Sequence, residues 1–407
     1  MATSSVVRLG IAGLGTIAQT VHLPNLRTLE DRFRVCHVCD VSAELAASIA
    51  AELPGEARVS SDWRDLCADD SVEAVLLLTP GAHAEAALAA LHAGKHVLAE
   101  KPLCITQAEA SHLAATAAEA GRVLQVAYMK MYDPVLPRAR ASLSELGSLR
   151  VVRITVLHPG DEGQVEHALI RTFPITEPGP VAAADAYAAA RTEEALGAGA
   201  PSGLTTLYND VLLGSVVHEL SLLRALGFQP PASYRYANAR PLSIERPATS
   251  PPCLLAVGDL GGGVELQLAW NWVPDYPEYT EELAVFGSAG RLYLDMPAPY
   301  LPAHRARLRV ERAARDERAA TTYHSSHITG FVRELAAFAD SIQIGAPVLS
   351  DAAGAGSDTR SLQALTAAIG ACAGIKLGGE AALSREPALG DAAASDGAAG
   401  RSATRGF

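Results

Sequence analysis

Strand-like and helix-like stretches alternate along the first 130 residues of the chain. Apolar runs predict strands at residues 6–12, 33–40, 72–78, 95–100 and 123–128. Helical patterns separate them, through Leu29 and at residues 43–53, 83–93 and 107–120. This alternation is typical of βαβ units and a parallel sheet, and the continuously apolar third run indicates a sheet covered on both faces.

The pattern changes after about residue 133. Alternating apolar and polar positions predict strands at residues 149–157, 254–257, 264–272, 282–286 and 291–295. Amphipathic helices are predicted from about Val211 to Leu226 and from Gly330 to Ile344. Residues 160–205 are rich in Gly, Ala and Pro without a clear period, so we expect an insertion or a long loop there. The second half therefore predicts an α+β domain with an open, largely antiparallel sheet.

Charge and composition exclude several classes of function. The chain has 33 basic and 45 acidic side chains, a net charge of −12, so no nucleic-acid partner is expected. No apolar run approaches the ~20 residues of a membrane span, and the first ten residues do not resemble a secretory signal. We therefore expect a soluble, cytoplasmic protein. Its six cysteines are too sparse in 407 residues for a disulfide framework.

A glycine-rich motif follows the first predicted strand and opens the first helix. Residues 13–18 read Gly-Leu-Gly-Thr-Ile-Ala and match G-x-G-x-x-A. In this context Gly13 permits a tight turn, Gly15 lets the backbone approach a pyrophosphate, and Ala18 lets helix and strand pack. A helix N-terminus supplies N–H groups for phosphates, so Thr16 and Ile17 are also expected at the cofactor.

Asp40 ends the second predicted strand, 25 residues after Gly15. A carboxylate at this place accepts hydrogen bonds from a ribose 2′-hydroxyl and repels a 2′-phosphate. The next residues, Val41 and Ser42, offer no Arg for such a phosphate. We therefore expect NAD, with NADP less favoured. The alternative is that Asp40 caps the next helix, although Ser42 is the better cap.

Glu100, Lys101 and Pro102 lie just past the carboxyl end of a predicted parallel strand, where ligands of such sheets bind. Lys101 is one of only four lysines, against 29 arginines. A lysine supplies a compact amine that a guanidinium does not replace, and Glu100 can orient it. The alternative interpretation is a solvated Glu-Lys turn.

These segments resemble the glucose–fructose oxidoreductase / inositol dehydrogenase / rhizopine-catabolism (Gfo/Idh/MocA) family. The resemblance covers roughly residues 6–375, and its most specific part is Ala93-Gly-Lys-His-Val-Leu-Ala-Glu-Lys-Pro102. The other similar segments are Gly13–Ala18 with His22-Leu-Pro24, Thr79-Pro80 with His83, residues 126–134, residues 286–290 and the helix near Phe331.

The resemblance implies a fold and a division of the chain. The expected fold class is α/β, with an N-terminal Rossmann NAD-binding domain at residues 1–133. An α+β domain for substrate binding and oligomerisation is expected at residues 134–382. Residues 383–407 are Ala, Gly, Ser and Asp with almost nothing to bury, so we expect a disordered tail.

The resemblance also implies site residues. The implied cofactor contacts include Thr79, Pro80, His83 and Glu100, while Lys101 would lie beside both the nicotinamide and the reacting hydroxyl. Lys130 and Tyr132 would line the substrate pocket.

The family's second-domain signature is an Asp followed four residues later by a His on one helix. His218 matches this histidine, but Gly214 stands at the Asp position. The i, i+4, i+8 spacing keeps Asp210, Gly214 and His218 near one face. We expect Asp210 or Glu219 to substitute in part for the missing carboxylate.

Other polar and aromatic groups receive structural interpretations. Cys36 and Cys39 lie on one predicted strand, and their side chains point to opposite faces of the sheet. A redox or metal-binding role is therefore not expected. His158, Asp161, Glu162, Glu166 and His167 lack tetrahedral ligand spacing, and a solvated loop is favoured over pocket lining or a metal site. Trp270 and Trp272 share a strand face that could pack a subunit interface.

The sequence thus predicts an NAD-dependent oxidoreductase acting on a sugar, amino-sugar or cyclitol, without a metal, as a homodimer or homotetramer. His218 would move the hydroxyl proton, and Lys101 would stabilise developing alkoxide charge. Two alternatives stay open. One is an NAD-dependent glycosidase that works by transient oxidation and elimination, and the other is a non-catalytic sugar or dinucleotide sensor.

Overall fold

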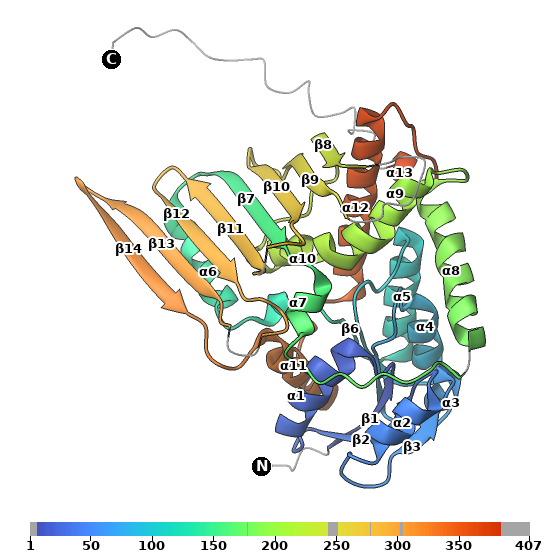
Figure 1. Ribbon diagram of the computed structural model, residues 1–407. Coiled ribbons are helices and arrows are strands. Elements are labelled where there is room, and N and C mark those ends of the chain that lie inside the picture. Colours follow the sequence, from blue (N-terminus) through green and yellow to red (C-terminus); the bar gives the residue numbers. More distant parts are fainter. Residues whose placement is uncertain (1–5, 177, 243–250, 277, 302–303, 384–407) are drawn as a thin grey trace, which may run out of the picture.

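The computed structural model describes residues 6–176, 178–242, 251–276, 278–301 and 304–383. Two sheets with helices around them make up this part of the chain (Figure 1). Of the tail predicted at residues 383–407, Leu383 is instead the last residue of a short helix, and residues 384–407 lie outside the described residues.

The first sheet is parallel and has the strand order β3-β2-β1-β4-β5-β6. Its strands are β1 (Val7–Ala12), β2 (Phe33–Cys39), β3 (Arg58–Ser60), β4 (Ala74–Leu77), β5 (His96–Ala99) and β6 (Leu124–Val126). Side chains alternate between its two faces: Leu76 and Leu98 join one buried cluster, and Val75 and Val97 join the other. Both faces are therefore covered, as the continuous apolar runs predict.

Helices from two distant parts of the chain cover this sheet. The first are α1 (Leu23–Thr28), α2 (Ala43–Ala50), α3 (Trp63–Cys67), α4 (Ala84–His92) and α5 (Gln107–Ala120). The helix α11 (Gly330–Ile344) has the predicted bounds, and it returns to pack Leu335 and Phe338 into the cluster that contains Leu76. The Phe338 ring stacks on Phe33 with centroids 6.4 Å apart.

The second sheet has eight strands in the order β14-β13-β12-β11-β7-β10-β9-β8. They are β7 (Leu149–His158), β8 (Tyr234–Arg240), β9 (Cys253–Asp259), β10 (Glu265–Trp272), β11 (Thr280–Gly287), β12 (Gly290–Met296), β13 (Arg307–Ala314) and β14 (Glu317–His324). β7 and β10 pair in parallel, and the other neighbours are antiparallel. The predicted fold class, a Rossmann sheet with a largely antiparallel second sheet, is confirmed.

The helix α12 (Ala352–Cys372) connects the two sheets. It packs against α5 of the first domain and against β8 of the second. Leu362 and Leu365 on α12 join one continuous buried cluster with Val152 and Ile154 of β7. The shorter elements between the sheets are η2 (Met129–Tyr132), α6 (Leu136–Ser142) and η3 (Leu143–Leu146), and α13 (Gly379–Leu383) follows α12.

The expectation of a long loop at residues 160–205 is wrong. This region contains α7 (Asp161–Val165), the 19-residue helix α8 (Pro178–Leu196) and the start of α9 (Ser202–Thr206). In α8 the buried residues are Thr192, Ala195 and Leu196, so the helix has no apolar period to detect. Its many alanines stabilise it through intrinsic helix propensity instead.

The helix predicted from Val211 begins earlier. A continuous helical path runs from α9 through the π-helical η4 (Leu207–Val216) into α10 (Val217–Leu226). It ends at Gly227, whose φ of 97° is left-handed, as a glycine C-cap allows. Among the described residues, no helix combines the length and apolar character needed to cross a membrane.

Candidate functional site

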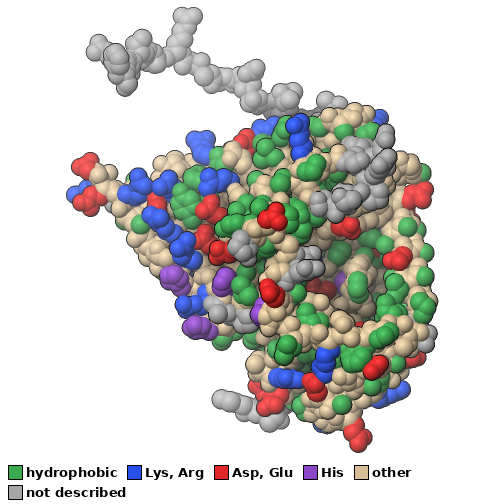
Figure 2. Space-filling model, in the orientation of Figure 1, with side chains coloured by type: hydrophobic (Ala, Val, Ile, Leu, Met, Phe, Trp, Pro, Cys, Tyr) green, Lys and Arg blue, Asp and Glu red, His purple; other side chains and the backbone are tan. Residues whose placement is uncertain are grey.

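A cavity of about 970 Å³ lies between the two domains. Its floor is formed by the loops that follow β1, β4 and β5, at the carboxyl ends of parallel strands where ligands of such sheets bind. Its other wall comes from η4 and the start of α10. Figure 2 shows the molecule hollowed between the lower domain and α8. The expected site residues that line the cavity are Gly13, Gly15, Thr16, Ile17, Asp40, Thr79, Pro80, Glu100, Lys101, Lys130, Asp210 and His218.

The glycine loop has the geometry that a pyrophosphate site needs. Gly13 has φ of 91°, and a Cβ there would lie 2.7 Å from backbone atoms of Leu78 and Thr79. A side chain at Gly13 would therefore push β1 and β4 apart. A Cβ at Gly15 would meet no described atom within 4 Å, so the bare backbone of this residue faces the cavity. The loop fits a dinucleotide.

Asp40 is fixed by two backbone amides. Its Oδ2 accepts a 2.8 Å hydrogen bond from the Leu14 N–H, and its Oδ1 accepts one of 2.9 Å from Ser42. Ser42 caps α2 through its own hydroxyl, so Asp40 is not the helix cap. Each carboxylate oxygen keeps a lone pair, so Asp40 can also accept from ribose hydroxyls.

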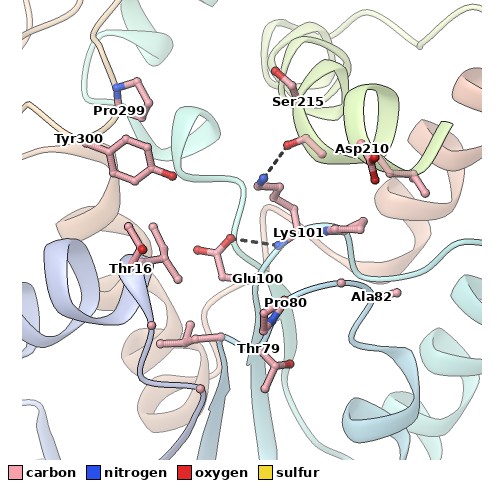
Figure 3. Close-up of a pocket in the computed structure, with 18 of the residues that line it drawn as sticks. Thr16, Thr79, Pro80, Ala82, Glu100, Lys101, Asp210, Ser215, Pro299 and Tyr300 are labelled. Atoms are coloured by element: carbon pink, nitrogen blue, oxygen red, sulfur yellow. Dashed lines mark hydrogen bonds between the residues drawn. The ribbon is translucent and has the colours of Figure 1, made fainter. Parts of the chain in front are cut away.

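Glu100 and Lys101 form the centre of the floor (Figure 3). The Glu100 carboxylate accepts a 3.1 Å bond from the Lys101 N–H and lies 3.1 Å from His22 Nε2. Burial raises the pKa of Glu100, but the His22 hydrogen bond and the Lys101 charge outweigh it and hold the pKa below its usual value. Lys101 Nζ crosses to the other wall, where it donates a 2.6 Å bond to the Gly214 carbonyl.

His218 faces this lysine from the second domain and lines the same cavity. Its Nδ1 is buried and has no hydrogen-bond partner among the described residues. Burial, together with the charges of Lys130 and Lys101, lowers the pKa of His218 well below its usual value. A neutral imidazole at this position can accept a proton from a hydroxyl.

Lys130 lines the cavity, but buried carboxylates hold its ammonium. Nζ donates to Glu281 and, over 3.1 Å, to Glu219 Oε1, and Tyr279 donates a 2.6 Å bond to the same Glu281. Burial lowers the pKa of Lys130, but the two glutamates outweigh it and raise it above its usual value. Burial raises the pKa of Glu219 to about 7 against the opposing charge of Lys130.

Three expected site residues lie outside the described cavity lining. Glu219 points into the Lys130 cluster. Tyr132 bonds Ser350 over 2.8 Å, which ties η2 to the segment before α12. His83 is buried behind the floor, where its ring nitrogens lie 3.0 Å and 2.9 Å from the carbonyls of Pro102 and Thr79. His83 therefore shapes the loops that carry Thr79 and Lys101.

Aromatic residues near the carboxyl ends of β7 and β10 also line the cavity. They are His158, Trp270, Trp272 and Tyr279. The His158 ring centroid lies 5.4 Å from both tryptophans, and Trp270 Nε1 donates to Ser215 Oγ over 2.9 Å. The expectation that the tryptophans face a subunit interface is corrected, because Trp270 is 2% exposed within this chain and Trp272 lines its cavity.

A segment that the sequence does not mark as functional, residues 170–175, also reaches the cavity. Ile170, Arg171, Thr172, Phe173 and Ile175 line it beside Asp40. This segment has no motif or apolar period, so no local signal marks it. The described residues contain no group of three or more His, Cys, Asp or Glu side chains that could hold a metal ion.

Residues 7–128 match a family model described as an oxidoreductase family with an NAD-binding Rossmann fold. An inositol 2-dehydrogenase from Salmonella typhimurium is 35% identical over 129 residues, 31% of this chain and 38% of that protein. One from Mycolicibacterium gilvum is 33% identical over 168 residues, 40% of this chain and 48% of that protein. The matched part thus spans less than half of the length of these relatives.

Solved structures with the same fold cover nearly the whole chain. A 3-ketoreductase from Actinomadura kijaniata in complex with TDP-benzene and NADP has a TM-score of 0.65 at 21% identity, covering 89% of this chain and 97% of that one. UDP-N-acetylglucosamine 3-dehydrogenase from Acidithiobacillus ferrooxidans has a TM-score of 0.64 at 20% identity, covering 90% and 99%.

Proposed function

Residues 7–128 belong to the Gfo/Idh/MocA oxidoreductase family, and from this premise we propose that the chain is an NAD-dependent oxidoreductase. Its substrate is a sugar, amino-sugar or cyclitol, oxidised at a carbinol carbon or reduced at the corresponding keto carbon. The relatives named inositol 2-dehydrogenase and the sugar 3-dehydrogenase with the same fold support this class of substrate.

One observation carries the proposal. The glycine loop, Asp40, Lys101 and His218 all line a single cavity, although they come from both domains. A dinucleotide on the glycine loop and a polyol near Lys101 would therefore share one enclosed space. Such convergence of a cofactor motif with acid–base groups indicates a reaction site.

The residues of this chain divide the work of the reaction. The nicotinamide supplies hydride transfer when the cofactor is bound. Lys101 donates to the substrate oxygen and stabilises negative charge that develops there. His218, neutral because of its lowered pKa, accepts the hydroxyl proton during oxidation. Glu100 positions Lys101 by accepting its backbone N–H.

Asp40 supports NAD as the cofactor, with NADP less favoured. An arginine does approach this end of the cavity, since Arg171 reaches α2 from the second domain. Its guanidinium is held by both carboxylate oxygens of Glu52 and by Ser48. With its charge balanced by Glu52, Arg171 is poorly placed to attract a 2′-phosphate.

Gly214 favours a second candidate function, a non-catalytic sugar or dinucleotide sensor. A glycine stands where the family has a carboxylate, and this backbone carbonyl receives Lys101. A sensor would bind NAD and show no hydride transfer. The NAD-dependent glycosidase is a third candidate, distinguished by glycoside turnover without NADH accumulation.

A cofactor-reduction screen tests the proposal. The purified chain is mixed with NAD or NADP and with panels of cyclitols, aldoses and amino sugars, and absorbance at the reduced nicotinamide band is followed. We expect NAD reduction with one panel. The proposal would be contradicted if NADH bound but no panel compound reduced NAD and no corresponding keto compound oxidised NADH.

The homodimer or homotetramer stays a prediction, to be measured by light scattering.

A further inference from the structure

A segment of the second domain crosses the first domain at the mouth of the cavity. Residues 170–176, here named the strap, lie between α7 and α8, and Figure 1 shows this stretch passing in front of the parallel sheet. The strap is held to the first domain at both of its ends. Each anchor flanks one part of the expected dinucleotide site.

The first anchor is the side chain of Gln19. Its Nε2 donates to the Arg171 carbonyl over 3.0 Å, and its Oε1 accepts from the Arg171 N–H over 2.9 Å. The same Nε2 donates to the Leu14 carbonyl over 2.8 Å, inside the glycine loop. Gln19 thus ties the strap to the loop that is expected to bind the pyrophosphate.

The second anchor is Thr176. Its N–H and its hydroxyl both donate to the Val41 carbonyl, over 3.1 Å and 2.9 Å. Its hydroxyl also accepts a 3.3 Å bond from the Ala43 N–H. Val41 directly follows Asp40, so this anchor lies at the expected ribose site.

Between the anchors, apolar side chains border the cavity. Phe173 packs against the buried cluster of the first domain, which seats the strap. Ile175 lines the cavity near Val41 but is still 56% exposed. A flat, partly apolar ligand placed beside Asp40 would cover this exposed surface, and adenine is such a group.

We propose that the strap forms the outer wall of the adenosine subsite, a proposal that rests on the proposed dinucleotide-dependent function. Ile175 contacts the adenine, and the Gln19 and Thr176 anchors hold the strap over the bound cofactor. The adenosine half leaves only when an anchor opens, so the dissociation of NADH is slowed.

Variants of the anchors test this wall without relying on activity. Gln19→Met and Thr176→Val keep side-chain size. The first removes both Gln19 bonds to Arg171, and the second removes the hydroxyl bonds of Thr176 but keeps its backbone N–H bond to Val41. The dissociation rate of NADH is measured by stopped-flow displacement. The affinity for ADP-ribose, which keeps the adenosine half and lacks the nicotinamide ring, is measured by calorimetry. The matched controls are Gln267→Met on β10 and Thr28→Val on α1, whose side chains, within the described part of the chain, bond to residues two or three positions away.

The double variant Gln19→Met/Thr176→Val should release NADH about tenfold faster, since several net hydrogen bonds are lost. The affinity of the double variant for ADP-ribose should fall by a similar factor, and so should that of Ile175→Ser. In both controls the NADH dissociation rate and the ADP-ribose affinity should stay within twofold of the unmodified chain. Unchanged NADH release would overturn the proposal. Weaker NADH binding with unchanged ADP-ribose affinity would also overturn it, because the strap would then act on the nicotinamide ring.

Hydrogen exchange on the unmodified chain gives a second test that needs no variant to fold. Addition of NADH should slow exchange at the Arg171 and Thr176 amides at least fivefold, and unchanged exchange there would contradict the strap. If NADH and NADPH fail to bind at all, the proposed function falls and the strap with it. NADH binding without hydride transfer contradicts the proposed function alone.

Discussion

Lys101 Nζ donates a 2.6 Å hydrogen bond to the backbone carbonyl of Gly214, and this bond joins the two domains across the cavity. Lys101 comes from the loop after β5, and Gly214 from the π-helical η4. The acceptor in this bond is a neutral backbone carbonyl. Figure 3 shows Lys101 reaching from the floor toward this helix.

Replacing Lys101 should remove catalysis and spare cofactor binding. We expect Lys101→Met to keep NADH affinity within about tenfold and to lower kcat/KM at least ~10²-fold, because a donor to the developing alkoxide is lost. Lys101→Arg should also fail, since a planar guanidinium does not reproduce a point donor. Steady-state kinetics and NADH titration measure both, with the exposed Lys376→Met as control. Near-normal turnover in Lys101→Met would refute the site.

His218→Ala should lose about 10²–10⁴ in rate, the usual contribution of a positioned general base. Because the pKa of His218 is lowered by burial and nearby positive charge, the acid limb of kcat/KM should lie below the usual histidine range. The variant should lose this limb, and the exposed His112→Ala should keep it. If His218→Ala turns over normally, Lys101 is the proton-transfer group and His218 has a packing role.

The cofactor preference should depend on Asp40 and Glu52. Asp40→Ala should weaken NADH by ~1–3 kcal/mol, the loss of charge-assisted hydrogen bonds. Asp40→Ser combined with Glu52→Gln should shift preference toward NADPH, because it removes one carboxylate and releases Arg171 from the other. Fluorescence titration compares both cofactors, with Glu52→Gln alone as control. Equal or tighter NADPH binding by the unmodified chain would contradict the NAD preference.

Gly214 should tolerate a side chain but resist a carboxylate. A Cβ at Gly214 would come no closer than 3.7 Å to its nearest neighbour, the Asn209 carbonyl, so Gly214→Ala should fold and gain up to about 1 kcal/mol of stability. Gly214→Asp should compete for Lys101 and fill space used by substrate, which lowers kcat/KM at least about tenfold. NADH affinity should not change. An unaltered or higher kcat/KM in Gly214→Asp would show that the carboxylate position is free to be restored.

Glu219 should make stability depend on pH. Its pKa is raised to about 7 by burial, so the folded chain binds this proton more tightly than the unfolded chain does. Its contribution is therefore complete below about pH 4.5 and is lost as pH rises through 7. The unfolding free energy of Glu219→Gln minus that of the unmodified chain should therefore increase from pH 5 to pH 8, by at most about 3 kcal/mol. Urea unfolding at both pH values measures this, with the exposed Glu119→Gln as control. If the difference in unfolding free energy between Glu219→Gln and the unmodified chain is the same at both pH values, Glu219 stays ionised.

The local features of the site follow from the sequence. The alternation of apolar runs with helical patterns predicts the parallel sheet, because successive side chains of a strand point to opposite faces of the sheet. The glycine spacing predicts the loop, since only a residue without a side chain fits where Gly13 meets Leu78 and Thr79. Asp40 and Lys101 follow strand ends, so their place at one edge of the sheet is also predictable. These are properties of short segments, and nearby residues decide them.

The tertiary structure decides which distant groups meet. Lys130 reads as a pocket lysine, but its ammonium is engaged by Glu281, 151 residues away. Trp270 reads as an interface residue, but β7 and η4 enclose it. The strap meets Gln19 across 152 residues and carries no motif. Each of these contacts depends on the path of the whole chain and on the matching of buried charges and hydrogen bonds, which no local pattern encodes.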